Sequence, residues 1–425
     1  MVKTLKNNKI VGNFFSLASI QVLNYILPVV TLPYLMRVLD LNSYGAYGVA
    51  QAMTQYFILF TDYGFNLTAT RDISKQREDK KRVSEIFSSV MSAKVLLLVV
   101  SFVILVLISL IVPNFRKNIL LNILTFGMVV GSVLFPTWFF QGIEEMKVSA
   151  LLNALSKIFF TIGIFMFVKA KGDIYLVAIL NSLGYIIAGC IALGIAIFKY
   201  KVRFVRPSFK QIRGQMREGW DIFVSNIASS IYTIGNTLLL GAFTNNTITA
   251  YYTGADKIIT ACSSVISPII QAVYPHVSRL MNESKIQVIK LTRKIWIGIT
   301  IVIGAGCVVL LFFSGWIFPI VFGEKYNDSI ILIQIMSFLP LIRGWTNVFG
   351  VLTMINFGYQ RFLSKIYFFA SMISLVTMPV LIYFLQDKGA ALNLTMIELG
   401  IMISMYVLLR KKEINIPKGT IKIEE

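Results

Sequence analysis

Histidine, cysteine and charged residues are scarce in this chain of 425 residues. There is one histidine, His276, and only 14% of the residues are charged, whereas ordinary soluble domains have about 25%. The three cysteines, Cys190, Cys262 and Cys307, are far apart and lie within apolar runs. This spacing fits neither a metal site nor a disulfide framework. We therefore expect no metal and no cofactor.

Hydrophobic residues make up 56% of the chain, and its mean hydropathy is +0.74. A single soluble core cannot bury so much apolar surface, so the sequence predicts a protein that has lipid as its solvent. Only helices and closed barrels pair all their backbone polar groups within lipid. The apolar runs are continuous, without the alternation of barrel strands, and the first run is too long for a signal peptide. The predicted fold class is all-α integral membrane.

Apolar runs between charged breaks predict about twelve transmembrane helices, since a span needs roughly 20 apolar residues. The expected spans of the first half are 11–36, 45–69, 86–112, 119–143, 148–168 and 174–198. Those of the second half are 221–243, 249–277, 295–319, 329–353, 363–386 and 389–409.

Lysine and arginine are distributed unequally between the two sides of this predicted bundle. With the N-terminus in the cytoplasm, the cytoplasmic segments carry 29 of the 40 lysines and arginines, counting Lys365 at the edge of span eleven, and the outer loops carry 7. Cytoplasmic loops of membrane proteins are enriched in these residues. The sequence thus predicts that both termini are cytoplasmic. The same rule explains the net charge of +20 without any nucleic acid partner.

Two lobes of six helices each are expected. The parts are an N-terminal lobe, a basic cytoplasmic linker, a C-terminal lobe and a cytoplasmic tail, at residues 1–198, 199–220, 221–410 and 411–425. Because each lobe has an even number of spans, both enter from the same side, which predicts pseudo-twofold symmetry along the membrane normal and a substrate site between the lobes. A weak repeat fits this symmetry: Ala46–Gln51 opens span two and Ala250–Ala255 opens span eight.

Catalytic motifs are missing from the sequence. It has no P-loop for nucleotide phosphates and no long polar segment that could form a nucleotide-binding domain. The outer loops are also short. The sequence therefore indicates neither ATP hydrolysis within the chain nor an enzyme active site.

Seven ionisable side chains within the predicted spans are the candidate functional residues. Each costs roughly 2.5 to 3.5 kcal/mol at the centre of a lipid-facing helix, so we expect them to line a water-filled cavity or to pair with one another. Four cations against three acids predict a net positive cavity, suited to a lipid diphosphate or an acidic sugar. The expected substrate-binding cations are Lys94, Lys157, Lys257 and Arg343, and the acids Asp62, Asp256 and Glu398 are candidates for ion coupling.

Buried ion pairs are the alternative interpretation. Asp62 with Lys94, or Glu398 with Arg343, would neutralise each other and hold helices together. Lys94 also lies close enough to the cytoplasmic end for its amine to reach the interface. Lys157 and Arg343 lie near mid-span, which favours a functional role for them.

Prolines and tryptophans have simpler expected roles. A proline inside a span removes a backbone hydrogen bond and kinks the helix, and prolines of this kind include Pro28, Pro33, Pro136, Pro268, Pro275, Pro340 and Pro379. The tryptophans fall mostly near span ends, as in the aromatic belts at membrane interfaces. Sugar stacking by Trp138 or Trp345 is the alternative.

Three segments resemble motifs of the Wzx-type polysaccharide flippases, in the multidrug/oligosaccharidyl-lipid/polysaccharide exporter superfamily. Asp62–Asp72, with the sequence DYGFNLTATRD, resembles a signature of that family. Phe135–Gly142 is similar to its span-four motif, and Gly254–Pro275 to its span-eight pattern. The resemblance extends over nearly the whole chain.

This resemblance implies translocation of an O-antigen or related oligosaccharide unit, linked to undecaprenyl diphosphate, across the bacterial inner membrane. It also implies a central cationic cavity, alternating access and coupling to protons or sodium ions. Lys157, Lys257 and Arg343 are the kinds of residue that line such cavities. Membrane lipids surround the protein, and a glycan polymerase and a chain-length regulator are expected partners.

Two other functions stay open. A cation-coupled multidrug extruder of the same superfamily takes mostly cationic substrates, so surplus acid is expected in its cavity. A membrane-embedded glycan polymerase or ligase needs a larger external loop than this sequence offers.

Overall fold

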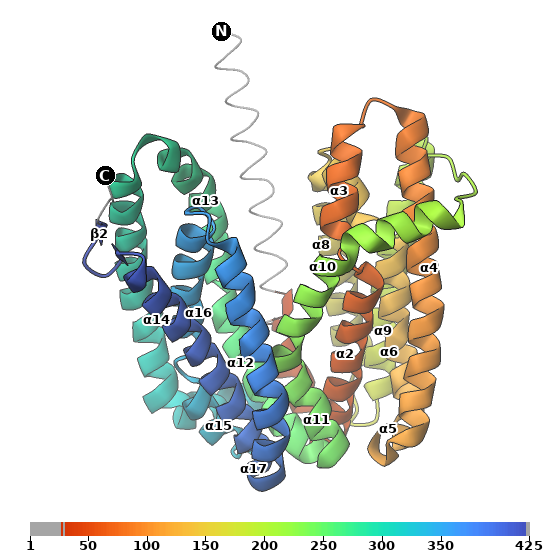
Figure 1. Cartoon of the computed structure of the whole chain (residues 1–425). Coiled ribbons are helices and arrows are strands. Elements are labelled where there is room, and N and C mark those ends of the chain that lie inside the picture. The colour runs from red at the N-terminus through yellow and green to blue at the C-terminus, as the bar shows by residue number, and fades with distance from the viewer. Residues whose placement is uncertain (1–26, 29, 422–425) are drawn as a thin grey trace. The chain divides into compact units, whose positions relative to one another are not determined.

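The fold was analysed in a computed structural model, which describes residues 27, 28 and 30–421 (Figure 1). Nearly all of these residues are helical, apart from loops and one short antiparallel pair of strands, β1 (Ile414–Asn415) and β2 (Thr420–Ile421). Within this part of the chain, eight helices are long and apolar enough to cross a membrane, or up to nine with one bent pair. The predicted all-α membrane fold is confirmed, whereas the number of twelve spans stays a prediction. Most of predicted span one, 11–36, lies outside the described residues.

The chain forms two compact units, one up to Ile227 and the other from Ala228 onwards. The boundary falls inside helix α10 (Phe209–Thr233). Because α10 begins at Phe209, residues 209–220 of the segment expected as a linker are helical. The two-lobe symmetry and the lobe boundaries stay predictions.

The first unit contains the helices that correspond to predicted spans two to six. They are α2 (Leu41–Asp62), α3 (Phe65–Lys75), α4 (Lys80–Ile111), α5 (Pro113–Lys117), α6 (Ile119–Leu134), α7 (Thr137–Gly142), α8 (Met146–Phe167), α9 (Ile174–Gly194) and the π-helical turn η1 (Ile195–Lys199). Helices α6 and α9 pack closely because small residues meet there. A Cβ atom on Gly189 would lie 2.5 Å from the carbonyl oxygen of Gly131.

The second unit contains the helices that correspond to the end of predicted span seven and to predicted spans eight to twelve. They are α11 (Gly235–Phe243), α12 (Asn246–Ser264), α13 (Ile266–Glu283), α14 (Lys285–Phe322), the 3-10 turn η2 (Glu324–Tyr326), α15 (Ser329–Met336), α16 (Leu339–Asn347), the π-helical turn η3 (Val348–Met354) and α17 (Gln360–Lys411). Within α17, Gln386 has non-helical backbone angles and is the last residue of predicted span eleven, three positions before predicted span twelve begins.

Several predicted spans are broken where the sequence suggested one continuous helix. Predicted span two, 45–69, is interrupted at Tyr63 and Gly64, which both have positive φ angles. Span four is interrupted at Phe135 and Pro136, between α6 and α7. The proline there removes a helical hydrogen bond, as expected. Pro275 and Pro379, in contrast, lie inside helices.

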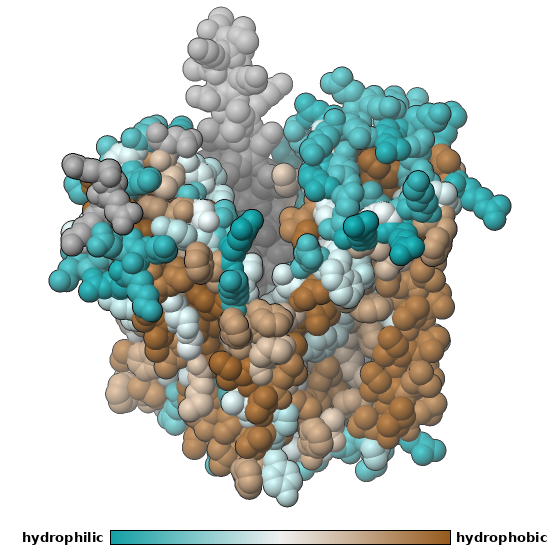
Figure 2. Space-filling model, viewed as in Figure 1, coloured by the Kyte–Doolittle hydropathy of each residue, from teal (hydrophilic) through white to brown (hydrophobic). Residues whose placement is uncertain are grey.

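Large apolar side chains on the surface are those expected to face lipid. Ile111 on α4 is 75% exposed and Phe312 on α14 is 72% exposed, which would be costly in water. In the first unit, hydrophilic side chains gather at the end that carries α3 and the start of α4, and hydrophobic surface covers much of the rest of α4 (Figure 2). We call this end the hydrophilic end of the first unit.

Candidate functional site

The first unit contains an ion pair between the buried Lys94 and the partly buried Asp62. The Nζ atom of Lys94 lies 2.8 Å from one carboxylate oxygen of Asp62, and it is also 3.4 Å from the carbonyl oxygen of Ser132. The Lys94 side chain is 2% exposed and that of Asp62 is 24% exposed. The second carboxylate oxygen of Asp62 accepts a hydrogen bond from the side-chain amide of Asn66 at 3.3 Å.

The break in the helix explains the position of Asp62. Because Tyr63 and Gly64 adopt left-handed backbone angles, α2 ends at Asp62 and α3 begins at Phe65. A carboxylate at the C-terminal end of a helix is unfavourable, since the helix dipole is negative there. The ammonium group of Lys94 offsets this repulsion, so the pair also stabilises the end of α2.

A small polar cavity lies beside Asp62. Its volume is about 80 Å³, and its lining includes Asp62, Asn66, Thr137, Asn153 and Tyr185. A cavity needs about 10–15 Å³ of probe-occupied volume and two to four polar partners to hold a water molecule. This cavity therefore has room for water or a small cation next to the Asp62 carboxylate.

The second unit contains a matching ion pair between Arg343 of α16 and Glu398 of α17. The Nε atom of Arg343 donates to a Glu398 carboxylate oxygen at 3.1 Å, and an Nη atom lies 3.5 Å from the hydroxyl of Ser263. The side chains are 19% and 9% exposed. Asp256 of α12 also interacts electrostatically with Arg343. The guanidinium group is therefore paired with Glu398 and also attracts the negative charge of Asp256.

A buried amide network lies next along α17. The side-chain amide of Asn393 donates to the hydroxyl of Ser374 at 3.0 Å and to the side-chain oxygen of Asn236 at 3.2 Å. The hydroxyl of Thr377 donates to the Asn393 side-chain oxygen at 2.7 Å. Asn236 and Asn393 are at most 1% exposed. Hydropathy alone gave no reason to single these residues out, since asparagine and serine carry no charge.

The seven predicted charges are divided between the two units. Lys94 and Lys157 belong to the first unit, and Lys257 and Arg343 to the second. Both ion pairs anticipated as the alternative interpretation are present. Lys157 on α8 is partly exposed, and Lys257 on α12 is exposed. Whether all four cations line one cavity stays a prediction.

Comparison with known proteins then identifies the family. Residues 10–281 match the family model described as polysaccharide biosynthesis protein. The chain belongs to the polysaccharide biosynthesis protein family. Over 402 residues, it is 31% identical to a protein of Escherichia coli (strain K12) provisionally named O-antigen transporter. The aligned region covers 95% of this chain and 97% of that protein. A protein of Shigella dysenteriae with the same name is 27% identical and covers 90% of this chain and 95% of its own length.

Solved structures place the fold of this polysaccharide biosynthesis protein among membrane transporters. The lipid II flippase MurJ in an inward closed conformation matches with a TM-score of 0.69 at 13% identity, over 93% of this chain and 87% of that one. An inward-facing multidrug resistance MATE family transporter of the MOP superfamily matches with a TM-score of 0.65 at 13% identity, over 93% and 98%. The expected resemblance is thus confirmed for both sequence family and fold.

The motif Asp62–Asp72 of this family member packs against the first part of α10, which belongs to the same unit. A Cβ atom on Gly64 would lie 2.9 Å from the carbonyl oxygen of Gly219, so the two backbones touch. Tyr63 stacks on Phe223 of α10, with 4.5 Å between ring centroids. Arg71 forms an ion pair with Glu218. We call these contacts of α10 with the break and with α3 the α10 clasp.

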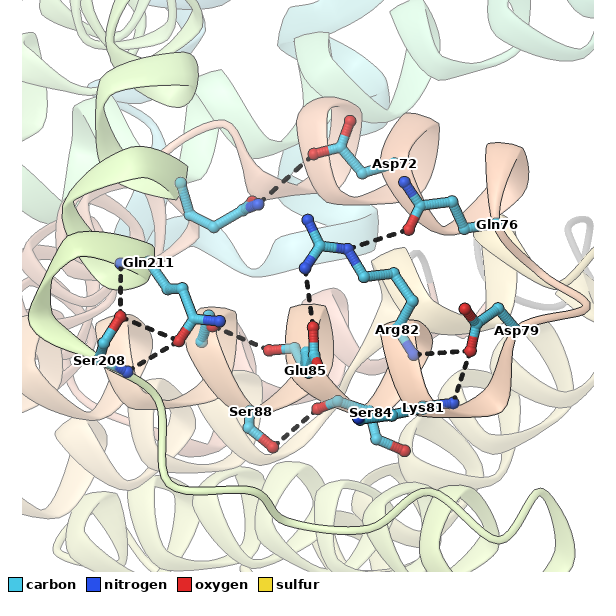
Figure 3. A network of polar contacts seen from close by, with 12 residues as sticks. Asp72, Gln76, Asp79, Lys81, Arg82, Ser84, Glu85, Ser88, Ser208 and Gln211 are labelled. Atoms are coloured by element: carbon cyan, nitrogen blue, oxygen red, sulfur yellow. Dashed lines mark hydrogen bonds and ion pairs between the residues drawn. The ribbon is translucent and has the colours of Figure 1, made fainter.

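Further polar contacts extend the clasp at the hydrophilic end of the first unit (Figure 3). The side-chain amide of Gln215 donates to Asp72 at 3.4 Å. The extended segment before α10 is fastened to α4, since the hydroxyls of Ser84 and Ser88 accept from the backbone N–H groups of Arg203 and Val205 at 3.1 and 2.9 Å. The first part of α10 is therefore an integral part of the first unit.

The span-four motif Phe135–Gly142 forms a packed core and not a sugar site. Trp138 is fully buried and lies 5.3 Å from Phe87, measured between ring centroids. The suggestion that Trp138 stacks on sugar, or belongs to an interfacial belt, is therefore wrong. Trp345 packs on Trp296, with 5.7 Å between centroids, and donates to the hydroxyl of Thr300 at 2.9 Å.

Proposed function

We propose that this family member moves an oligosaccharide unit, linked to undecaprenyl diphosphate, from the cytoplasmic to the outer leaflet of the bacterial inner membrane. The observation that carries the proposal is the similarity, over 95% of the chain, to the E. coli protein provisionally named O-antigen transporter. A polar sugar and a diphosphate cannot cross bare hydrocarbon at a useful rate, because burying charges and unpaired polar groups is too costly. Transport requires a hydrated path and no bond chemistry, in keeping with a transporter that is not an enzyme.

Arg343 is the proposed contact for the anionic part of the substrate. A guanidinium group has five N–H donors, of which Glu398 and Ser263 engage two. The others are available for phosphate oxygens, which arginine binds bidentately. Lys94, Lys157 and Lys257 are proposed to add positive charge along the transport path.

Ion coupling is proposed to act at the acids. Binding of a proton or a sodium ion at Asp62 would neutralise the carboxylate and release Lys94, which changes the charge of the first unit. Glu398 and Asp256 would act in the same way on Arg343. A ligand shifts a conformational equilibrium only when it binds the two states differently, and a released cation provides such a difference for an anionic substrate.

Alternating access between two six-helix lobes, with both termini in the cytoplasm, is the proposed transport cycle. A glycan polymerase and a chain-length regulator would act on the product at the outer face. These partners are the ones that the family resemblance implies; an oligosaccharide unit delivered to the outer face is a substrate for a polymer-forming reaction.

Deletion of the gene tests the proposal. We expect loss of surface glycan and accumulation of the lipid-linked unit on the cytoplasmic side, both reversed by the intact gene. Unchanged surface glycan together with increased drug sensitivity would favour the multidrug extruder. Accumulation of single units on the outer face would favour a polymerase or ligase.

A further inference from the structure

A long apolar groove runs between the two halves of α17, before and after Gln386. Its volume is about 440 Å³, and its walls extend from Phe362 to Leu381 on one half and from Asn393 to Leu408 on the other. At 1.5 Å per residue, the first wall is about 28 Å long, close to the roughly 30 Å of a hydrocarbon core. The groove thus has the length of a lipid chain that crosses most of the bilayer.

Two glycines set the shape of the groove. Near the turn at Gln386 the halves of α17 touch, since a Cβ atom on Gly389 would lie 2.0 Å from the carbonyl oxygen of Leu381. Gly400 lies in the wall of the groove, and a Cβ atom there would meet nothing within 4 Å. Glycine is unfavourable in the middle of a helix. The empty space at Gly400 is room that a larger side chain would fill.

The side chains of Thr377 and Asn393, which line the groove, are already hydrogen-bonded. Thr377 donates to the side-chain oxygen of Asn393, and the amide of Asn393 donates to Ser374 and Asn236. An apolar chain in the groove therefore leaves these groups satisfied. The remaining walls are mostly aliphatic and aromatic, as at Phe369 and Ile373.

The end of the groove that lies away from Gln386 carries positive charge. Lys365 lines it, and Arg361 precedes it by about one helical turn. Arg410, Lys411 and Lys412 follow at the other end of α17, and the Nζ atom of Lys412 lies 5.9 Å from the ring centroid of Tyr359, just before α17. The two ends of α17 are therefore neighbours. Cations of this kind bind phosphate groups.

We propose that this groove binds the hydrocarbon chain of the lipid-linked substrate, with the phosphate groups of that lipid at the cationic end. The proposal rests on the proposed function, which supplies a lipid with one polyprenyl chain and a diphosphate. A groove between two adjacent helices accommodates one chain, whereas a bilayer phospholipid has two. The chain is held on α17 while the polar head enters the protein.

Photocrosslinking of the full chain in nanodiscs tests this assignment. The nanodiscs contain palmitoyl-oleoyl phosphatidylcholine with a few mole per cent undecaprenyl phosphate as the probe. One variant carries p-benzoylphenylalanine in place of Ile373 in the groove, and the control carries it in place of Ile301 on α14; the two isoleucines are 56% and 66% exposed. We expect polyprenyl adducts at position 373 at least fivefold above the mole fraction of the probe, and adducts at position 301 in proportion to it. Adducts in proportion to the probe at both positions would overturn the proposal. It would also be overturned if phosphatidylglycerol, added as a competitor, reduced the adducts at position 373 as strongly as added undecaprenyl phosphate does.

A groove-filling variant provides the second test. Gly400→Leu should abolish the enrichment at position 373, whereas Gly306→Leu, on an exposed glycine of α14 that also has open space around it, should leave it intact. Lys365→Glu leaves the interior of the groove unchanged and should weaken the enrichment several-fold. If Gly400→Leu fails to fold, the test depends on Lys365→Glu. Full enrichment at position 373 in the Lys365→Glu variant would contradict the proposed binding of phosphate at the cationic end. The crosslinking assay measures lipid binding and not export, so its outcome is independent of the gene deletion. Unchanged surface glycan in the deletion strain would reject the proposed function but would not reject lipid binding in the groove.

Discussion

Gly219 and Tyr63 touch through their backbones: a Cβ atom on Gly219 would lie 2.5 Å from the carbonyl oxygen of Tyr63. The contact joins the middle of α10 to the break between α2 and α3. Asp62, which pairs with Lys94, immediately precedes that break. The clasp that holds α10 and the ion pair of the first unit therefore share one piece of backbone. Movement of α10 away from the first unit would require that this piece of backbone be exposed.

Gly219→Ala should loosen the clasp. The added methyl group has no space beside Tyr63, and overpacking of this kind costs about 1 to 3 kcal/mol. We expect a lower melting temperature in detergent and reduced surface glycan in a complemented deletion strain. Gly214→Ala is the matched control, because Gly214 lies on the same helix and a Cβ atom there would meet nothing within 4 Å. Alanine at that position should stabilise the helix by about 0.5–1 kcal/mol. Equal stability of the two variants would argue against the clasp.

Lys94→Met should destabilise the first unit. Removal of one partner leaves the Asp62 carboxylate without its cation, and breaking a buried pair costs about 3–5 kcal/mol; the 24% exposure of Asp62 favours the lower end of that range. The double variant Asp62→Asn with Lys94→Met should recover most of the loss, because no unpaired charge remains. Thermal unfolding followed by tryptophan fluorescence measures the difference. A double variant as unstable as Lys94→Met would mean that Lys94 acts through packing.

Much of the membrane architecture could be predicted from hydropathy, because lipid imposes length and apolar character on each span. The breaks could not be predicted in the same way. A single glycine changes the mean hydropathy of a span little, so predicted span two continued through Gly64 to residue 69. The break depends on the positive φ angles of Tyr63 and Gly64 and on the close approach of Gly219, which is 155 positions away in the sequence.

The ion pairs within the spans could likewise be predicted only in part. Hydropathy places Lys94 and Arg343 within spans, and the cost of an unpaired charge in lipid predicts that each has a polar environment. Which acid each one meets depends on packing between residues 32 and 55 positions apart. Sequence reasoning could therefore name both pairs as an alternative to a cavity but could not choose. The uncharged network around Asn393 gave no such signal at all.

Asp173 gives a pH dependence outside the membrane-spanning segments. The backbone N–H groups of Ala170 and Lys169 donate to its carboxylate at 2.7 and 2.8 Å and lower its pKa below the ordinary value. A lowered pKa in the folded protein means that the stabilisation is present above the pKa of the unfolded chain, about 3.9, and is lost as the pH falls through the folded value. Asp173→Ala should therefore lower the melting temperature at pH 7, and its difference from the intact protein should shrink on going to about pH 3. Lys171→Ala, in the same loop, should show no such trend. A difference that is constant with pH would contradict the role of the charged carboxylate.

Arg343 and Glu398 allow a structural role to be separated from a role in transport. Arg343→Ala should reduce both stability and export, because Glu398 then lacks its cation. The double variant Arg343→Ala with Glu398→Gln removes the unpaired charge and should return the melting temperature most of the way towards that of the intact protein. Export should stay low in the double variant if the guanidinium group contacts the anionic substrate, and Arg343→Lys should restore it only in part, since lysine lacks the bidentate geometry of arginine. The measurements are surface glycan per cell and the amount of protein in the membrane, taken on the same cultures. Full export by a stable double variant would mean that Arg343 has only a structural role, in the contact between α16 and α17. Other cations would then bind the substrate.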